Sequence, residues 1–258
     1  MTRTPALVAF DLDDTLAESK SPIDPRMAQL LTRLLDLVPV CIISGGRFEQ
    51  FRSQVLDRLD LSDDEADRLH LMPTCGTRYL RAEGGVWVQR YANDLSADEK
   101  SRALAAVEAE ARRLGLWRED SWGPILEDRG SQITYSALGQ SAPVAEKQAW
   151  DPDGRKKSSL RSAVAAELPD LEVRSGGSTS IDITHRGIDK AYGMRRLSEV
   201  TGIDCSDMLF VGDRLDPDGN DYPVIATGTA THAVTGWRDT ADYLAEQLIP
   251  LLSHGRES

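Results

Sequence analysis

The chain opens with an apolar run, Ala6–Phe10, that leads directly into two aspartates, Asp11 and Asp13. A run of this length is typical of a strand buried on both faces of a parallel sheet. Open α/β sheets bind ligands outside the carboxyl ends of their strands, and both acids are predicted to lie there. One carboxylate can then attack phosphorus while the other handles protons and a divalent metal bridges the charges. The alternative is a solvated acidic turn that caps a helix.

The following segment alternates between short apolar runs and apolar residues at helical spacing. Strands are predicted at 6–11, 38–43 and 69–73, and helices at 25–37 and 48–59. This β-α-β-α-β order implies a parallel sheet with helices on both faces.

The pattern then changes. Residues 77–80 and 86–90 flank a hairpin turn, and an alanine- and glutamate-rich helix is predicted at 98–115. Further elements are predicted as strands at 124–127, 132–138, 172–174, 180–184, 208–211 and 222–227, and as helices at 155–168, 192–201 and 240–252. Strict alternation returns only after Gly187. We therefore expect an α/β protein with a Rossmann-like core at 1–80 and 187–258 and an inserted α+β domain at 81–186.

The 258 residues carry a formal net charge of −12. Nucleic-acid-binding proteins normally present a basic face, so this balance argues against such a partner. The three cysteines, Cys41, Cys75 and Cys205, show neither zinc spacing nor a disulfide framework. Because no signal peptide and no apolar run of membrane length is visible, we expect a cytoplasmic protein without a membrane partner.

Three more polar residues stand where strands end or helices begin. Ser44 follows an apolar run and precedes two glycines, Lys190 opens a helical pattern, and Asp213 follows another apolar run. Each segment also has an ordinary structural interpretation. Ser44 could cap the next helix, Lys190 could be a solvated lysine, and residues 218–221 could form a plain loop.

In this order, the Asp-x-Asp-x-Thr motif, the strand-end serine, the lysine and the Gly-Asp…Asn-Asp segment resemble the haloacid dehalogenase (HAD) superfamily of aspartate-nucleophile phosphotransferases. The resemblance implies that Asp11 forms an aspartyl-phosphate and that Asp13 is the general acid and base. It also implies that Ser44 donates a hydrogen bond to the phosphoryl group and that Lys190 offsets its charge.

A Mg²⁺ cofactor is implied by the same resemblance, since Mg²⁺ prefers oxygen ligands and usually keeps several waters. The residues expected to hold or support it are Asp11, Asp13, Asp213, Asn220 and Asp221, with the main-chain carbonyl of Leu12 or Asp13 contributing. Asp14 stands where many members of the superfamily have glycine, and we expect it to be an acid at a helix N-terminus.

The position of the insert resembles the type IIB cap, and within that branch the chain resembles eukaryotic-type phosphomannomutases. The segments 176–182 and 187–190 parallel that family's GGxxSxD…GxDK pattern. The substrate-binding residues that this resemblance implies are Lys20 and Gly45 in the core and Arg129, Gln140, Lys147, Ser180 and Asp182 in the cap. Lys20 replaces an arginine of the family. Arg129, Gln140 and Lys147 stand where three arginines would hold the remote phosphate. Ser180 would join them, and Asp182 would bind sugar hydroxyls.

Arginine can clamp a phosphate with two hydrogen bonds, lysine is a point charge and glutamine carries no charge, so this cap has a weaker clamp than a mutase's. A mutase must retain a bisphosphate intermediate, whereas a phosphatase transfers the group to water. We therefore expect a phosphatase acting on a sugar phosphate or a similar small phosphate ester. A phosphohexomutase that interconverts hexose 1- and 6-phosphates is the alternative, and a non-catalytic sugar-phosphate-binding protein is a third hypothesis.

The oligomeric state is expected to be a monomer or a homodimer formed through the caps. Trp87 and Trp117 could serve a dimer contact, although buried tryptophans are the commoner explanation. Residues that could line a sugar pocket, or simply belong to a core, are Trp122, Ile125, Gln132 and Tyr135.

Overall fold

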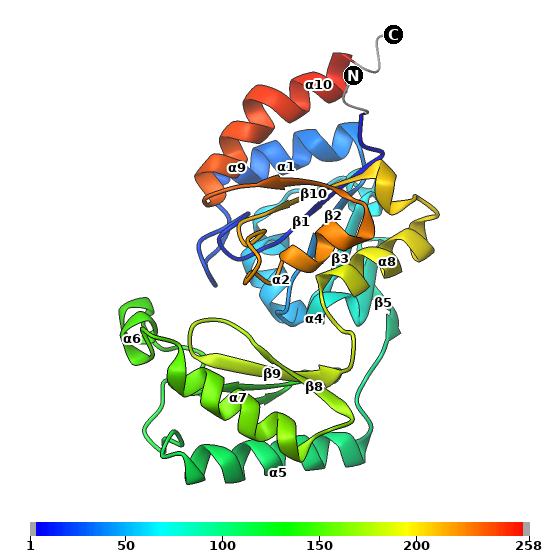
Figure 1. Ribbon diagram of the computed structural model, residues 1–258. Helices are drawn as coiled ribbons and strands as arrows, with labels where there is room; N and C mark the ends of the chain where they lie inside the picture. Colours follow the sequence, from blue (N-terminus) through cyan, green and yellow to red (C-terminus); the bar gives the residue numbers. More distant parts are fainter. Residues whose placement is uncertain (1–3, 255–258) are drawn as a thin grey trace. The chain divides into compact units, whose positions relative to one another are not determined.

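A computed structural model describes residues 4–254 (Figure 1). The chain divides into two compact units. The first, here called the core unit, combines the described residues up to Ala92 with those from Asp189 onward. The second, the cap unit, is the continuous segment Asn93–Ile188.

The core unit is built on one seven-stranded sheet in the order β11-β10-β1-β2-β3-β4-β5. Its strands are β1 (Leu7–Phe10), β2 (Val40–Ile43), β3 (Leu69–Met72), β4 (Arg78–Glu83), β5 (Val86–Ala92), β10 (Met208–Gly212) and β11 (Ala230–Ala233). The five strands from β11 to β3 are parallel, while β4 and β5 pair antiparallel at one edge. The mixed α/β fold predicted from the sequence is therefore confirmed.

Helices cover both faces of this sheet. The helices and helical turns of the core unit are α1 (Pro25–Leu37), α2 (Phe48–Gln54), η1 (Leu56–Arg58), α3 (Asp63–Asp67), α4 (Pro73–Gly76), α8 (Lys190–Thr201), η2 (Cys205–Asp207), η3 (Tyr222–Thr227), α9 (Trp237–Tyr243), η4 (Leu244–Leu248) and α10 (Ile249–His254). Successive residues of β1 serve opposite faces, as strand geometry requires. Phe10 packs in the cluster that contains α1 and α10, whereas Ala9 packs with Met194 of α8.

Helix α1 shows why the sequence folds as predicted here. The Asp24 carboxylate caps the helix by accepting from the Arg26 N–H, and Pro25 supplies a preset φ in the first turn. The buried side chains of α1, all at helical spacing, are Met27, Leu30, Leu31, Leu34 and Leu35.

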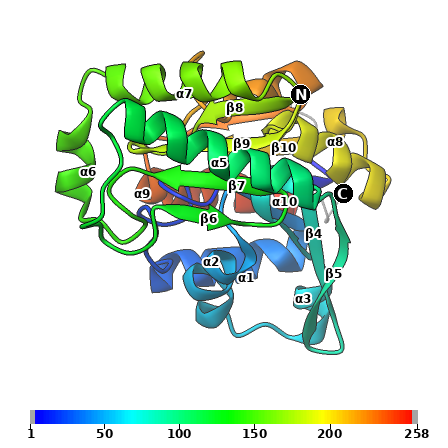
Figure 2. The same cartoon turned by 90° about the horizontal axis from the view of Figure 1, so that it is seen from below.

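The cap unit contains a four-stranded antiparallel sheet in the order β6-β7-β9-β8. Its elements are α5 (Ala97–Arg113), β6 (Leu126–Asp128), β7 (Gln132–Ser136), α6 (Val144–Trp150), α7 (Arg155–Glu167), β8 (Leu171–Ser175) and β9 (Ser180–His185). Helices α5 and α7 lie over the same face of the sheet, where Ile133 and Tyr135 enter the apolar core (Figure 2). The alternate residues Gln132, Thr134 and Ser136 give the opposite face a polar character.

One domain boundary and the type of one element differ from the sequence-based expectation. Residues 81–92, assigned to the insert, complete β4 and form β5 of the core sheet, because the hairpin pairs in register with β3. Tyr222–Thr227, predicted as a strand, is the 3-10 helix η3. Its β-branched residues do not alternate between two buried faces, since only Val224 is buried, and the edge strand is Ala230–Ala233 instead.

Three of the aromatic residues singled out in the sequence pack in or against the apolar clusters of the two units. Trp87 lies on β5 of the core unit and packs against its apolar cluster, so it does not belong to the cap unit. Trp117 stacks on Tyr135, whose hydroxyl donates to the Leu116 carbonyl. Tyr135 is therefore a core residue. Across residues 4–254, no helix combines the length and apolar character needed to cross a bilayer.

His70 and Tyr79 form a buried titratable pair in the core unit. The Nδ1 atom of His70 on β3 lies 2.8 Å from the Tyr79 hydroxyl, and the two rings stack. Burial, assisted by the nearby Arg81 charge, lowers the pKa of His70 to about 4. The folded protein therefore holds this imidazole in its neutral form at neutral pH.

We expect His70 to make folding pH-dependent. Its pKa is lower in the folded than in the unfolded chain, so the unfolded state binds the extra proton as pH falls from about 6.5 toward 4, and stability decreases by up to about 3 kcal/mol. Urea unfolding across this range should show a smaller decrease for His70→Gln than for the parent protein. His254→Gln, which removes an exposed histidine, is the control. An equal pH dependence in all three proteins would contradict this role.

Candidate active site

Asp11 leaves the carboxyl end of β1, and its N–H donates to the Val211 carbonyl of β10. Its buried carboxylate lies 2.7 Å from the Nζ atom of Lys190. Lys190 is the first residue of α8, a helix that Asp189 caps by accepting from the Tyr192 N–H. The cap therefore fixes the helix start that delivers the lysine to the end of the central strand.

Lys190 is 1% exposed and lies between two carboxylates, those of Asp11 and Asp221. The interpretation of this lysine as a solvated surface residue is wrong. Burial alone would lower the pKa of its ammonium, but the charges of Asp11 and Asp221 outweigh burial and raise the pKa. The lysine is therefore a permanent positive charge inside the protein.

Asp213 and Asp221 come from the two ends of the loop that follows β10. Thr15 ties this loop to the N-terminal segment, because its hydroxyl donates to Asp213 Oδ1 at 3.2 Å and accepts from the Asp213 N–H at 3.1 Å. Fully buried Asp221 accepts from the Arg214 N–H and so closes the loop on itself. The interpretation of residues 218–221 as a plain loop does not account for the buried carboxylate of Asp221.

One carboxylate oxygen from each of Asp11, Asp213 and Asp221 lies within 4.8 Å of the other two. Burial is the main cause that raises the pKa of Asp11 well above its usual range, and the charges of Asp221 and Asp213 raise it further. Lys190 opposes this shift but does not cancel it. Burial and the Asp221 charge also raise the pKa of Asp213. Three carboxylates around one ammonium leave an excess of negative charge that suits a divalent cation with hard oxygen ligands.

Asp13 lies outside this group of three carboxylates. Its carboxylate accepts from Gln50 Nε2 at 2.9 Å, from Gln54 Nε2 at 3.2 Å and from the main-chain N–H of Lys20 at 2.7 Å. Gln50 and Gln54 project from one side of α2, four residues apart. The sequence analysis missed both glutamines. The Asp13 carboxylate therefore lies outside this cluster, whereas the metal contacts expected from a main-chain carbonyl of Leu12 or Asp13 and from the exposed Asn220 stay predictions.

Asp14 has a left-handed backbone, with φ of 61°, and its carboxylate accepts from the Ser19 N–H. The prediction of a helix N-terminal acid is wrong, because this segment is a turn. Aspartate tolerates the left-handed region better than most residues. Glycine would adopt this conformation without steric cost.

Ser44 and Gly45 open a tight turn after β2. The Ser44 hydroxyl accepts from the Gly46 N–H at 3.2 Å, and α2 begins later, with Arg47 as its N-cap residue. The helix-cap interpretation of Ser44 is therefore wrong. A Cβ atom on Gly46 would lie 2.2 Å from Gln50 Oε1, so glycine leaves the room in which Gln50 reaches Asp13.

A left-handed segment braces this turn from the other side. Thr74 and Cys75 have φ values of 49° and 54°, which costs each non-glycine residue on the order of 1 kcal/mol. Their N–H groups donate to the Gly46 and Ser44 carbonyls, both at 2.9 Å. The strain therefore places two main-chain donors against the serine turn.

Two of the expected substrate-binding residues of the cap unit, Gln140 and Lys147, are hydrogen-bonded to each other. Lys147 Nζ donates to the Gln140 carbonyl at 3.0 Å, and the Gln140 amide donates to the Ser136 hydroxyl at 2.8 Å. Ser136 lies opposite Ser180 in the β7–β9 register. The structure thus gathers Gln140, Lys147 and Ser180 on neighbouring segments.

Asp182 lies on the same pair of strands and accepts from the Thr134 hydroxyl at 2.7 Å. Arg129 forms a 2.7 Å ion pair with Glu127, and both side chains are largely buried. The sequence analysis did not identify Glu127, which compensates the arginine charge within its own β6–β7 hairpin. The i, i+2 spacing of Glu127 and Arg129 is a signal that could have revealed this pairing.

The fold is shared with solved hydrolases. One is an IMP-bound IMP-nucleotidase variant from Plasmodium falciparum, with a TM-score of 0.71 and 14% identity over 96% of this chain and 67% of that chain. Another is a haloacid dehalogenase-like hydrolase from Bacteroides thetaiotaomicron, with a TM-score of 0.61 and 16% identity over 93% and 98% of the two chains. The chain therefore shares the fold of a haloacid dehalogenase-like hydrolase.

The sequence comparison defines the family. Residues 27–250 match the family described as eukaryotic phosphomannomutase. A probable phosphomannomutase of Caenorhabditis elegans is 25% identical, with 94% of this chain and 95% of the relative aligned. The spinach (Spinacia oleracea) phosphomannomutase is 24% identical, with 95% and 97% aligned. The chain belongs to the eukaryotic phosphomannomutase family, and it is an enzyme of phosphoryl transfer.

Lys190→Met should destabilise the protein strongly, because it leaves Asp11 and Asp221 buried without their counter-charge. We expect a loss of about 3 kcal/mol or more in the free energy of unfolding. Lys100→Met, which removes the more exposed ion pair with Asp128, is the matched control and should lose about 1 kcal/mol or less. Urea unfolding in the presence of a chelator measures both values. Equal losses would refute the central role of the buried lysine.

Proposed function

We propose that this protein is a magnesium-dependent phosphohexomutase that works through an aspartyl-phosphate on Asp11. The observation that carries the proposal is the Asp11–Lys190–Asp221 cluster, with a second acid, Asp13, held separately by two amides. The sequence analysis expected a phosphatase first and a mutase second. The similarity to phosphomannomutases over nearly the whole chain supports the reverse order.

The two acids are suited to different tasks. A carboxylate oxygen of Asp11 attacks phosphorus, and the bond between phosphorus and the sugar oxygen breaks as the aspartyl-phosphate forms. Asp13 gives its proton to the leaving sugar oxygen and later removes a proton from the hydroxyl that accepts the phosphoryl group. Lys190 and the Ser44 hydroxyl offset the charge of the phosphoryl oxygens. In a mutase the aspartyl-phosphate gives its phosphoryl group to the free hydroxyl of a sugar monophosphate, and a bisphosphate forms. Asp11 then takes back the phosphoryl group at the other end of that bisphosphate, and the isomeric monophosphate is released.

The carboxylate cluster fits Mg²⁺. Asp11 and Asp213 would hold the ion, with Asp221 and Asn220 supporting it directly or through water. When bound, Mg²⁺ would stabilise negative charge on the transferring phosphoryl group. The fit rests on buried oxygen donors whose excess negative charge a single lysine does not balance.

The cap residues favour a small substrate with a second anionic end. Arg129 and Lys147 supply positive charge, Ser180 a hydroxyl, and Asp182 an acceptor for sugar hydroxyls. Because the similar proteins are named phosphomannomutases, a mannose phosphate is the first substrate to test.

A phosphatase remains the second candidate because of two specific features. Gln140 carries no charge at a position where the family clamp has arginine, and Glu127 pairs with Arg129. Both features reduce the positive charge available to retain a bisphosphate. Release of that intermediate to water would make hydrolysis the net reaction.

Mg²⁺ should stabilise the parent protein in a saturable way, by about 2.7 kcal/mol at a hundredfold excess over its dissociation constant. Asp213→Asn should raise the dissociation constant for Mg²⁺ at least tenfold, because it removes a charged ligand. Asp216→Asn, an exposed acid of the same loop that pairs with Arg214, should leave it unchanged. Thermal unfolding against Mg²⁺ concentration provides the readout, independent of activity. Identical titrations for the two variants would exclude the proposed site.

Phosphorus NMR distinguishes the two reactions directly. With mannose 1-phosphate, Mg²⁺ and a trace of hexose bisphosphate, we expect the 6-phosphate signal to grow faster than inorganic phosphate. Asp11→Asn should abolish both signals while leaving the fold intact. Gln140→Arg should raise the ratio of 6-phosphate to inorganic phosphate, because it restores a charged clamp. Inorganic phosphate as the sole product would establish the phosphatase instead.

A further inference from the structure

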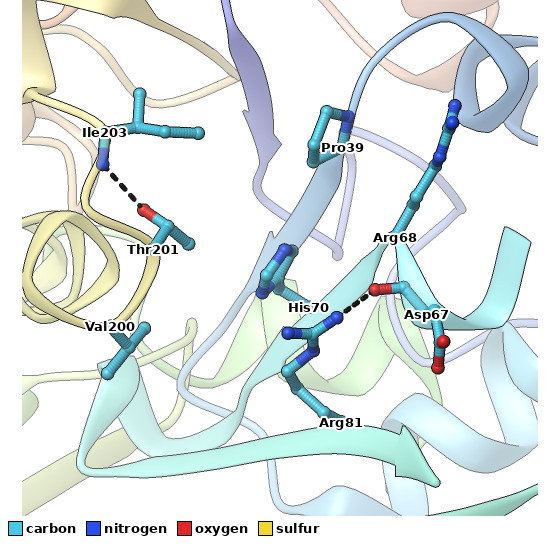
Figure 3. A pocket seen from close by; sticks show the side chains of 8 residues that line it. All are labelled: Pro39, Asp67, Arg68, His70, Arg81, Val200, Thr201 and Ile203. Atoms are coloured by element: carbon cyan, nitrogen blue, oxygen red, sulfur yellow. Dashed lines mark hydrogen bonds between the residues drawn. The ribbon is translucent and has the colours of Figure 1, made fainter. Parts of the chain in front are cut away.

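A cavity of about 330 Å³ lies in the core unit at the start of β2 and β3, opposite the strand ends that carry Asp11 and Ser44 (Figure 3). Pro39 and Arg68 directly precede these two strands, and Val200 and Ile203 approach from the end of α8. Its volume falls in the range typical of small-molecule sites. The cavity is separate from the carboxylate cluster.

Two arginines give this cavity positive charge. Arg68 donates to the Leu35 and Asp36 carbonyls, and Arg81 donates to the main-chain carbonyl of Asp67. Neither guanidinium belongs to an ion pair among residues 4–254, although most arginines of this acidic chain pair with carboxylates. Asp67 is the one acid in the lining, so the cationic charge is in excess.

Arg81 has an unused donor at this place. Its Nε atom is buried and lacks a hydrogen-bond partner within the described chain. Leaving such a donor unsatisfied costs on the order of 1 kcal/mol or more, and native structures rarely retain one without a reason. Figure 3 shows Arg81 beside His70, with its guanidinium directed at Asp67. The Nε atom itself is enclosed by the protein, so an anion in the cavity would meet the part of Arg81 that lines it and the positive charge that the guanidinium carries.

The remaining lining is compatible with an organic ligand. The side chains of Pro39, Val200 and Ile203 form an apolar wall, and the 95%-buried His70 ring is neutral and so adds no competing charge. A ligand with an oxyanion head and a short apolar body matches both parts of the lining. Inorganic ions would leave the apolar wall uncovered.

We infer that this cavity binds a small organic oxyanion, a carboxylate or a phosphate-type group on an apolar body, through Arg81 and against the wall of Pro39, Val200 and Ile203. The site does not depend on the proposed phosphohexomutase activity. Two elements that line it also reach the catalytic residues. Helix α8 runs from Lys190 to Thr201, and β3 runs from the cavity toward the strained Thr74–Cys75 turn.

The test uses benzoate and phenylphosphonate, which share one apolar body, carry different oxyanions and are not hydrolysed. The chain has four histidines, so the ring signals of His70 can be resolved by NMR with His70→Gln as the assignment reference. We expect saturable shifts of His70 with a dissociation constant on the order of 1 mM. The stronger of the two probes identifies the preferred oxyanion, carboxylate or phosphate-type.

Two variants place the binding in this cavity. Arg81→Gln should weaken it at least tenfold, and so should Val200→Glu, which puts a negative charge at an exposed helix position where folding is not at risk. Arg90→Gln, an exposed arginine of neighbouring β5, should bind like the parent protein. The inference is overturned if His70 shows no saturable shift, if both pocket variants bind normally, or if uncharged benzyl alcohol binds as well as the anions.

Discussion

The ammonium of Lys190, enclosed between the carboxylates of Asp11 and Asp221, is the interaction on which the core unit depends. Three separate segments meet there: the end of β1, the start of α8 and the loop after β10. Buried charges are tolerated only when they are paired and hydrogen-bonded, so none of these segments can move without exposing an uncompensated charge. The same arrangement holds the carboxylate of Asp11 at a fixed place at the end of a rigid strand, as preorganised chemistry requires.

The two aspartates of the N-terminal motif differ because their surroundings differ. Asp11 is buried among carboxylates, whereas half-buried Asp13 is held by the amides of Gln50 and Gln54. Such a division allows two chemically identical groups to take different roles. It also explains the glycine at 46, since the turn that presents Ser44 must pass close to Gln50. The serine turn, α2 and Asp13 therefore form one connected arrangement.

Much of this arrangement could be predicted from the sequence because parallel strands end at a common edge. Short apolar runs ending in Asp11, Ser44 and Asp213 were sufficient to bring these residues together in a hypothesis. Contacts between elements distant in sequence could not be predicted in this way. The hydrogen bond from Gln54 to Asp13 depends on how α2 packs. Element η3 contains β-branched residues but is not a strand, because only Val224 is buried. The sequence analysis proposed Arg129 as a phosphate-binding residue without its partner, and the structure pairs the Arg129 charge with Glu127.

The order of the strands has a consequence for how the chain folds. Central strand β1 pairs with β10, so that Leu7 lies beside Met208, while the cap unit is a continuous segment whose strands pair among themselves. During synthesis β1 emerges first but must wait for its neighbour until most of the chain has been made. The cap unit can complete its own sheet earlier. Non-local pairing of this kind slows folding, and until β10 arrives one edge of β1 is open to unwanted strand pairing.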